Sequence, residues 1–178
     1  IPPAAMANLM AYLRAEFGAR VEGVLTLFDD EETFVSALVH GSGEATLAAD
    51  DVFAGERALR LTVLQKYSDR IAGWEFPIAE HPGAGEYRYL RLAWKALDSA
   101  GVGLELAADG EWGPAESEKR RYVSGENLAP WAAQQLSPEA PEEWTVVTID
   151  LWKDNGSFTR TGIAPTTMSG TALFDRIE

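Results

Sequence analysis

The stretch GWEFPIAEHPGAGEYRYLRLAWK (residues 73–95) decides the fold that we predict for this chain. It holds two strand-like runs joined by a loop that contains Pro82 and two glycines, all of them turn residues. In the second run, apolar and polar residues alternate with a period of two, which is typical of a half-buried strand. The side chains of Leu90, Leu92 and Trp94 are therefore predicted to face the core.

The opposite face of this strand carries aromatic and cationic side chains: Tyr87, Tyr89, Arg91 and Lys95. Tyrosine and arginine side by side can stack on a polar ligand and donate hydrogen bonds to it. Cross-strand packing of tyrosine and arginine on an ordinary sheet surface gives the same pattern. Both interpretations of this face stay open at the level of sequence.

Length and composition point to a single globular domain. The chain has 178 residues, of which 46% are hydrophobic and 24% charged, which is enough for one buried core and short for two domains. The formal net charge of −13 argues against nucleic acid as a partner, because phosphate binding rests on clustered lysine and arginine. No apolar run approaches the roughly 20 residues of a membrane span, so we predict no membrane insertion. The lack of cysteine excludes disulfides, thiolate catalysis and zinc–cysteine sites.

An amphipathic helix is predicted for residues 1–20, before a domain at 21–178. Two prolines open this helix, and Gly18 is well placed to end it. Its apolar face consists of Met6, Leu9, Met10, Leu13 and Phe17. We expect this face to pack on the following domain or on an upstream region, because the polar face lacks the dense Lys/Arg cluster of membrane-surface helices. Since the chain begins without an initiator methionine or a signal peptide, we expect a fragment of a longer protein.

From residue 21 the sequence changes to short apolar runs separated by turn residues. This pattern predicts about nine or ten short strands and no further helix, hence an all-β fold, an antiparallel β-sandwich or barrel. The predicted strands are 24–28, 44–48, 58–64, 74–78, 87–95, 102–106, 122–124, 145–152, 158–164 and 172–177. Surface loops are predicted for 112–121 and for 128–143, the latter with one short helical turn. Besides the central strand, the predicted core holds Leu59, Leu61, Val63, Leu104, Val147, Ile149 and Leu151.

Seven phrases, in order, resemble a β-sandwich module of large multidomain proteins from planctomycete-type bacteria, related to galactose-binding-like jelly rolls and carbohydrate-binding modules. They are LFDDEETF (27–34), GERALRLTV (55–63), GEYRYLRLAWK (85–95), RYVSGEN (121–127), EEWTVVTIDLWKDNG (142–156), TGIAPTTM (161–168) and ALFDRI (172–177). The resemblance implies a jelly-roll sandwich in an exported protein, extracellular or periplasmic. Some members of the wider superfamily bind glycans and others dock proteins, so the fold alone does not name a ligand.

Calcium is the cofactor that this resemblance implies. In many modules of the superfamily, a structural calcium joins the start of the first strand, a segment before an inner strand, and an aspartate of the last strand. The matching positions here are Asp29 or Asp30, the region of Glu56, and Asp175. Ca²⁺ takes about six to eight oxygen ligands, so such a cluster could join both ends of a sandwich. The alternative is a solvated acidic turn, with Asp175 paired to a nearby arginine.

Aromatic side chains are the predicted ligand-binding groups. The apolar C–H faces of sugar rings stack on flat aromatic rings, and their hydroxyls bond to polar side chains at the rim. Trp112 and Trp131 lie in loop-like sequence, and Trp152 lies on the outer face of the predicted strand 145–152. The predicted site therefore joins Tyr87, Tyr89 and Arg91 to Trp152 or to the two loop tryptophans. For any single aromatic residue, ordinary packing is the alternative.

Catalysis finds little support in the sequence. His40 and His81 lie in no metal-binding or nucleophile motif, and no spacing among the 28 acidic residues singles out a catalytic pair. We therefore predict a non-catalytic accessory module that binds a neutral oligosaccharide or polysaccharide, since the negative charge disfavours anionic chains. The alternative is a structural domain, or one that docks a neighbouring protein domain, which would bury its aromatic face in a broad apolar patch.

Overall fold

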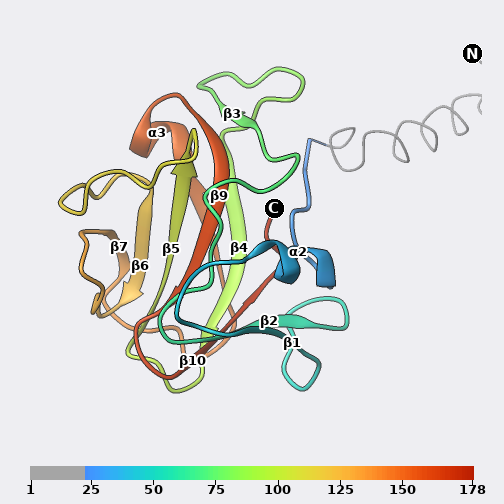
Figure 1. The fold of residues 1–178 in the computed structure, drawn as a ribbon, viewed down its shortest axis with the longest axis vertical. Coiled ribbons are helices and arrows are strands. Elements are labelled where there is room, and N and C mark those ends of the chain that lie inside the picture. The colour runs from blue at the N-terminus through green and yellow to red at the C-terminus, as the bar shows by residue number, and fades with distance from the viewer. Residues whose placement is uncertain (1–22) are drawn as a thin grey trace, which may run out of the picture.

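A computed structural model describes residues 23–178, so the helix predicted for 1–20 lies outside the described residues. The strands are β1 Ala45–Ala48, β2 Ala58–Thr62, β3 Phe76–Ile78, β4 Tyr89–Ala96, β5 Gly101–Ala108, β6 Arg121–Gly125, β7 Gln134–Ser137, β8 Thr145–Asp150, β9 Phe158–Thr167 and β10 Thr171–Asp175. They form two five-stranded sheets, β1-β2-β10-β4-β8 and β3-β9-β5-β6-β7 (Figure 1). Two short helices, α2 Glu32–Ala37 and α3 Leu151–Asn155, complete the described elements.

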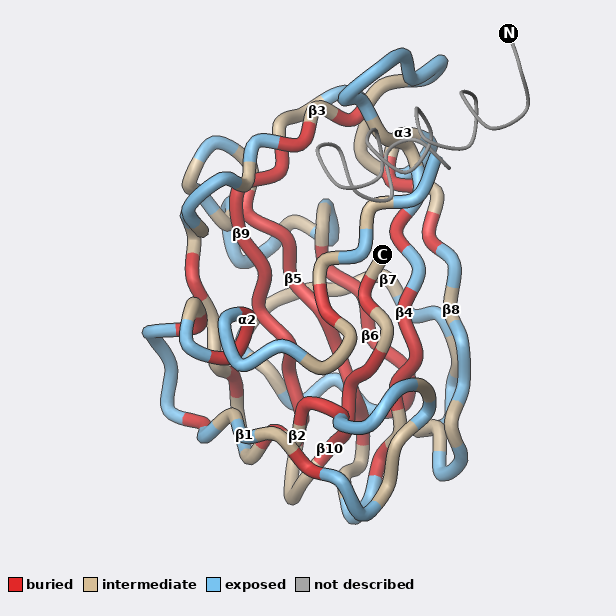
Figure 2. Tube along the Cα trace, turned by 90° about the vertical axis from the view of Figure 1, so that its right-hand side faces the viewer, coloured by how far each residue is buried: buried red, intermediate tan, exposed pale blue. Residues whose placement is uncertain are grey.

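The predicted all-β, jelly-roll-like sandwich is confirmed, with one difference in strand direction. All the paired strands run antiparallel except β6 and β7, which pair in parallel. Most of the residues of β4, β5, β9 and β10 are buried (Figure 2). Among residues 23–178, no helix is long and apolar enough to cross a membrane.

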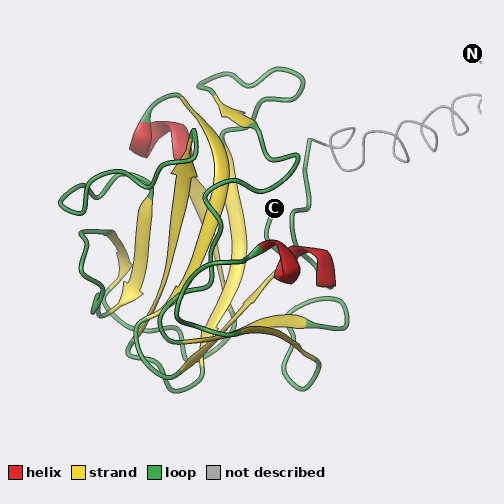
Figure 3. Cartoon of the chain, in the orientation of Figure 1, coloured by secondary structure: helices red, strands yellow, loops and turns green. Residues whose placement is uncertain are grey.

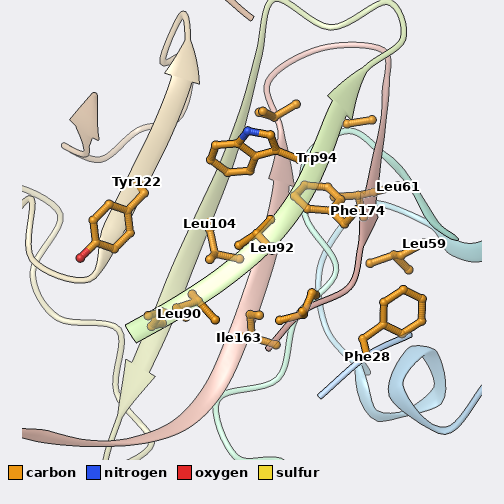
Figure 4. Close-up of a cluster of buried hydrophobic side chains, with 14 of the residues drawn as sticks. Phe28, Leu59, Leu61, Leu90, Leu92, Trp94, Leu104, Tyr122, Ile163 and Phe174 are labelled. Atoms are coloured by element: carbon orange, nitrogen blue, oxygen red, sulfur yellow. The ribbon is translucent and has the colours of Figure 1, made fainter. Parts of the chain in front are cut away.

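The central strand β4 has the predicted orientation. Leu90, Leu92 and Trp94 are fully buried and point into the space between the sheets (Figure 4). The Trp94 ring meets the ring of Phe174 on the neighbouring strand β10 edge to face, at 6.4 Å between centroids. Tyr89, on the opposite face, is 57% exposed. Alternation therefore located this strand correctly, because one of its faces covers the core and the other meets solvent.

Most of the other predicted core residues are buried, but Val63 is not. Its side chain is 47% exposed, because β2 ends at Thr62 and the alternation of faces ends there. Val147 is only partly buried, since β8 lies at the edge of its sheet. Leu151 is buried as predicted, although it begins the helix α3.

The prediction of no helix after residue 20 is wrong at two places. The strand predicted to reach residue 152 ends at Asp150, whose side chain accepts the N–H of Lys153 and caps α3. The helix then stops at Gly156, whose φ of 75° favours glycine. In α2, Phe34 and Val35 are buried against the core. Both helices are too short for a clear 3.6-residue period, so the sequence pattern did not reveal them.

Two other segments differ from the predicted strands and loops (Figure 3). Residues 134–137, placed in a surface loop with a helical turn, form the edge strand β7 beside β6. Its side chains are half-buried or exposed, so no apolar alternation marks it. Residues 24–28, predicted as a strand, contribute only a single backbone bridge, between Phe28 and Ile177.

Candidate ligand-binding site

The structure does not bring the predicted ligand-binding residues together on one surface. These residues lie on two separate surfaces, the tyrosine face and the aromatic cleft. The tyrosine face lies on the sheet of β4 and β8 and consists of Tyr87, Tyr89, Arg91, Thr148 and Glu178. The aromatic cleft lies on the other sheet and consists of Gln65, Tyr67, Glu105, Trp112, Arg121 and Trp131. The prediction that Trp112 and Trp131 flank the tyrosines is therefore wrong.

The floor of the aromatic cleft is a buried polar network. Glu105 on β5 and Arg121 on β6 are direct partners in the strand register. Arg121 Nε donates to Glu105 Oε1 at 2.6 Å, and Gln65 Nε2 donates to Glu105 Oε2 at 2.6 Å. All three side chains are less than a tenth exposed. The charges are thus paired and held in one geometry, which is the condition for a buried ion pair to be tolerated.

The same arginine also fixes the loop that carries the first wall of the cleft. Arg121 Nη1 donates to the carbonyl oxygens of Pro114 and Ser117, at 2.6 and 2.9 Å. Trp112 stands at the start of this loop, with its ring edge-on to Tyr67 at 5.5 Å between centroids. The floor therefore helps to hold this loop in place.

Trp131 forms the second wall. The guanidinium carbon of Arg121 lies 5.9 Å from the centre of the Trp131 ring. Asn127 donates to the carbonyl oxygen of Trp131 at 2.8 Å, and Ala132 donates to Ala115, which ties the two loops together. The three aromatic side chains, Tyr67, Trp112 and Trp131, are each half-buried around a hollow of about 220 Å³. Part of each ring therefore stays open to a ligand.

Sequence reasoning found the two tryptophans of the cleft but missed its other residues. The available signal was Glu105, which stands between Leu104 and Leu106 in a run that is otherwise apolar. A charged residue on a strand that is buried on both faces needs a partner. Here that partner is Arg121 on the adjacent strand. Gln65 and Tyr67 follow the end of β2, and nothing local places them beside β5.

The tyrosine face has fewer fixed donors than the cleft. Tyr89 is exposed, but Tyr87 packs edge-on against Phe76, with 5.8 Å between the ring centres. Arg91 Nε donates to a carboxylate oxygen of Glu178 at 3.0 Å, so its charge is paired. A hollow of about 290 Å³ lies between these residues and Val24. The face offers apolar area, while its cation is already engaged.

Trp152 lies on α3, near the end of the tyrosine face. The guanidinium of Arg88 stacks between its ring and that of Tyr89, at 5.2 and 5.4 Å from their centres. Arg88 also forms a two-pronged ion pair with Asp150, with Nε and Nη2 donating at 3.0 and 2.8 Å. This arginine holds the pKa of Asp150 below its ordinary value. Trp152 therefore supports the sheet surface through Arg88.

Replacing Asp150 with asparagine is expected to lower the melting temperature at pH 7. Because its folded-state pKa is lowered, the carboxylate stabilises the fold above the ordinary aspartate pKa of about 3.9 and loses this effect as the pH falls through the lower value. The deficit of D150N should therefore shrink below about pH 4. Thermal unfolding of both proteins across this pH range measures the deficit. D150A also removes the helix cap and serves as the more destabilised reference. A deficit that does not change with pH would contradict the role of the charge.

The carboxylates predicted to bind calcium accept hydrogen bonds from backbone N–H groups. Asp30 Oδ1 accepts from Glu56 and Arg57 at 2.9 and 2.8 Å, and these donors lower the pKa of Asp30. Asp175 Oδ2 accepts from the N–H groups of Phe53 and Ala54 at 2.9 and 3.1 Å. Burial raises the pKa of Asp175. One loop, 53–57, is thus tied to both the first and the last segment of the sandwich.

These residues do not fit a calcium site in this arrangement. Glu56 contributes its N–H while its side chain is exposed, and Asp29 pairs with Arg176 at 3.0 Å. A metal needs several oxygens that face it. Donors already occupy Asp30 Oδ1 and both oxygens of Asp175, while Asp29 Oδ1 is buried without a hydrogen-bond partner among the described residues. Gly55 closes the loop with φ 67°, and a side chain there would come within 2.6 Å of Asp30. Within residues 23–178, no group of three or more aspartate, glutamate, histidine or cysteine side chains is arranged for a metal ion.

Millimolar calcium is accordingly expected to leave the melting temperature unchanged, and a chelator should have no effect either. A ligand that binds only the folded state raises the melting temperature, so the measurement is sensitive to a structural ion. Magnesium at the same ionic strength serves as the control. A rise with calcium that the chelator reverses would restore the prediction drawn from the resemblance.

Comparisons with known proteins give likenesses of fold only. No protein-family model matches the chain, and no curated protein matches it in sequence. The glycoside hydrolase domain of Endo-D from Streptococcus pneumoniae R6 is 12% identical over 78% of this chain, with a TM-score of 0.49. A structure of carbohydrate-binding modules from the beta-sandwich superfamily is 13% identical over 86%, with a TM-score of 0.46. A family 22 carbohydrate binding module of Clostridium thermocellum is 8% identical over 78%, with a TM-score of 0.39.

The chain spans 20% of the length of the first of these proteins, 60% of the second and 80% of the third. Identities this low do not transfer a ligand or a site from one chain to another. The function is therefore argued from the residues of this chain.

Proposed function

We propose that the chain is a non-catalytic accessory module that binds a neutral oligosaccharide or polysaccharide in the aromatic cleft. The observation that carries this proposal is the combination of three half-buried aromatic rings with a buried polar floor. Sugar rings need both parts, because their C–H faces stack on aromatic rings while their hydroxyls need fixed hydrogen-bonding groups.

The cleft is prepared for binding before a ligand arrives. Arg121 is engaged by Glu105 and by three backbone carbonyl oxygens of the 113–117 loop, so it holds that loop in place. Because the loop and its tryptophan are already ordered, little conformational entropy remains to be lost on binding. A hollow of about 220 Å³ is smaller than the roughly 300–1,000 Å³ of enclosed small-molecule pockets. It suits an open cleft that holds part of a longer chain.

Neutral sugars fit the electrostatics of the cleft better than anionic ones. The one arginine of the floor is paired with Glu105, so the pair offers no net positive charge. The whole chain carries a formal charge of −13. A sulfated or uronic chain would be repelled by this field without gaining a free cation in the cleft.

A catalytic role in the cleft is disfavoured because its carboxylate, Glu105, is already fully hydrogen-bonded. Both oxygens of Glu105 accept short hydrogen bonds, from Arg121 and Gln65. A glycosidase acid or nucleophile needs a carboxyl group that faces the scissile bond, with a second carboxyl group about 5–10 Å away across the sugar. Within the cleft, Glu105 is the one carboxylate among the lining residues of the described chain. The exported location that the family resemblance implies is consistent with binding of extracellular glycans.

The second candidate function is docking of a neighbouring protein domain on the tyrosine face. The specific observation in its favour is exposed apolar area on and beside that face. Val24, Phe53, Tyr89 and Val146 are 37, 43, 57 and 47% exposed. Patches of this kind mark protein contacts when they are contiguous. Docking and glycan binding use opposite sheets, so they can be tested separately.

A glycan screen with the whole chain tests the proposal. Neutral plant, fungal and bacterial oligosaccharides are offered beside sulfated and uronic ones, and hits are titrated by tryptophan fluorescence. We expect saturable binding of a neutral class, with quenching or enhancement from Trp112 and Trp131. If no neutral glycan binds in the screen or in the fluorescence titration, the glycan-binding proposal is wrong and the docking function is favoured.

A further inference from the structure

Arg160 on β9 is a buried cation without a charge partner in the described chain. Its side chain is 3% exposed. Within residues 23–178, neither its Nε nor its Nη2 has a hydrogen-bond partner, although both atoms are inaccessible to solvent. Burial lowers the pKa of Arg160 to about 9, which leaves the guanidinium charged at neutral pH. Buried arginines are normally paired with a carboxylate, because an isolated buried charge is costly.

The surroundings of Arg160 supply only part of what its charge requires. The guanidinium carbon lies 5.0 Å from the centre of the Trp74 ring, a favourable cation–π contact that provides no hydrogen-bond acceptor. The hydroxyl of Tyr87, also buried, has no partner among the described residues either. Both side chains line a small hollow of about 20 Å³. The two residues that carry these unsatisfied groups thus line the same hollow.

This small hollow adjoins the larger hollow of the tyrosine face. Leu25, Tyr87, Tyr89 and Glu178 line both of them. Glu178 is the one carboxylate residue that lines the small hollow in the described chain, but its side chain already accepts from Arg91 and Arg176. The larger hollow, of about 290 Å³, has an apolar and aromatic wall and opens to solvent beside Val24. A ligand body can lie there while its charged end reaches inward past Tyr89.

We propose that the guanidinium of Arg160 and the hydroxyl of Tyr87 form a carboxylate-binding site beneath the tyrosine face. A carboxylate has two oxygens in one plane, so one can accept from the guanidinium while the other accepts from the hydroxyl. This site is separate from the aromatic cleft and does not depend on the neutral glycan proposed for it.

The carboxylate can come from two sources that share this chemistry. One is a small acid of monosaccharide size, such as a uronic acid, whose ring would lie in the larger hollow against Tyr89. The other is the chain itself, since the segment before Gly23 contains two acidic residues, Glu16 and Glu22, and Gly23 lines the larger hollow. The experiment separates the two.

The first arm titrates the whole chain with glucuronate and, as the matched neutral probe, with glucose, and follows the melting temperature. If the source is a free acid, glucuronate raises the melting temperature by a few degrees, roughly the effect of saturating one site, and glucose does not. The R160M variant should lose this response. Y87F, which removes only the hydroxyl, should weaken binding roughly tenfold. R160K keeps the charge but lacks the planar fork, and replaces R160M if that variant does not fold.

The second arm compares E16Q, E22Q and R160M without added ligand. If the chain provides the carboxylate, R160M and one glutamine variant each lower the melting temperature, the double variant lowers it no further, and glucuronate has no effect. Either pattern supports the site and names its source. The proposal is overturned if glucuronate gives no shift, both glutamine variants melt like the wild type, and R160M melts at the same or a higher temperature. W112A should respond to glucuronate like the wild type, so this test stands apart from that of the cleft.

Discussion

Replacing Trp112 with alanine is expected to weaken binding of a neutral oligosaccharide by roughly 30-fold or more, because a central stacking aromatic contributes about 2 kcal/mol or more. Its ring forms one wall of the cleft and contacts Tyr67 edge-on. The substitution removes the stacking surface, while the loop that carries it stays fastened to Arg121. The loss should therefore appear mainly in affinity, while the lost edge-on contact with Tyr67 lowers stability by about 0.5–1.5 kcal/mol. Isothermal titration with the best ligand of the glycan screen measures the affinity.

Tyr89→Ala is the matched control for this prediction. Tyr89 is an exposed aromatic residue on the opposite sheet, so its removal deletes a comparable ring without touching the cleft. Its affinity for the glycan should equal that of the wild type. Loss of binding in Y89A together with normal binding in W112A would move the glycan site to the tyrosine face.

Replacing Leu92 with alanine is expected to lower the free energy of unfolding by about 2–5 kcal/mol. Leu92 is fully buried between the sheets, and its strand β4 lies between β10 and β8. The truncated side chain leaves a cavity that close-packed neighbours fill only in part. Chemical denaturation measures the change, provided that the slope of the transition is the same in both proteins.

Val63→Ala serves as the control, since it removes a similar apolar side chain from a position that is 47% exposed. A surface change of this kind should alter the free energy of unfolding by no more than about 0.5 kcal/mol. Equal losses in L92A and V63A would show that the register of the core differs from the one described.

The sequence was sufficient for the sandwich because the information was local to each strand. On β4, Leu90, Leu92 and Trp94 lie on one face, and the opposite face carries Tyr89, Arg91 and Lys95, so alternation alone predicted the orientation. The same argument failed at Asp150, because Leu151 continues the alternation of Ile149 while the backbone turns into a helix. A cap is a single hydrogen bond, and a period of two does not detect it.

The aromatic cleft could not be assembled from the sequence, because its parts meet only through pairing of distant segments. Glu105 and Arg121 are opposite each other in the β5–β6 register, and Gln65 reaches them because it forms a backbone bridge to Thr166 of β9. Trp112 was one of the alternatives expected beside Tyr89, since it lies in loop-like sequence, yet the two residues line hollows on opposite sheets. Residue type predicted the kind of chemistry, whereas strand order decided which residues share a surface.

The most direct test of the central claim is a two-dimensional NMR titration of the indole N–H signals with a neutral oligosaccharide. The chain has six tryptophans, so six such signals are expected. Assignment by single substitutions gives each signal its residue. We predict that the Trp112 and Trp131 signals shift on binding, while those of the buried Trp94 and of Trp152 on the tyrosine side stay in place. Shifts confined to Trp152, or no shift at a saturating ligand concentration, would contradict the assignment of the aromatic cleft as a glycan-binding site.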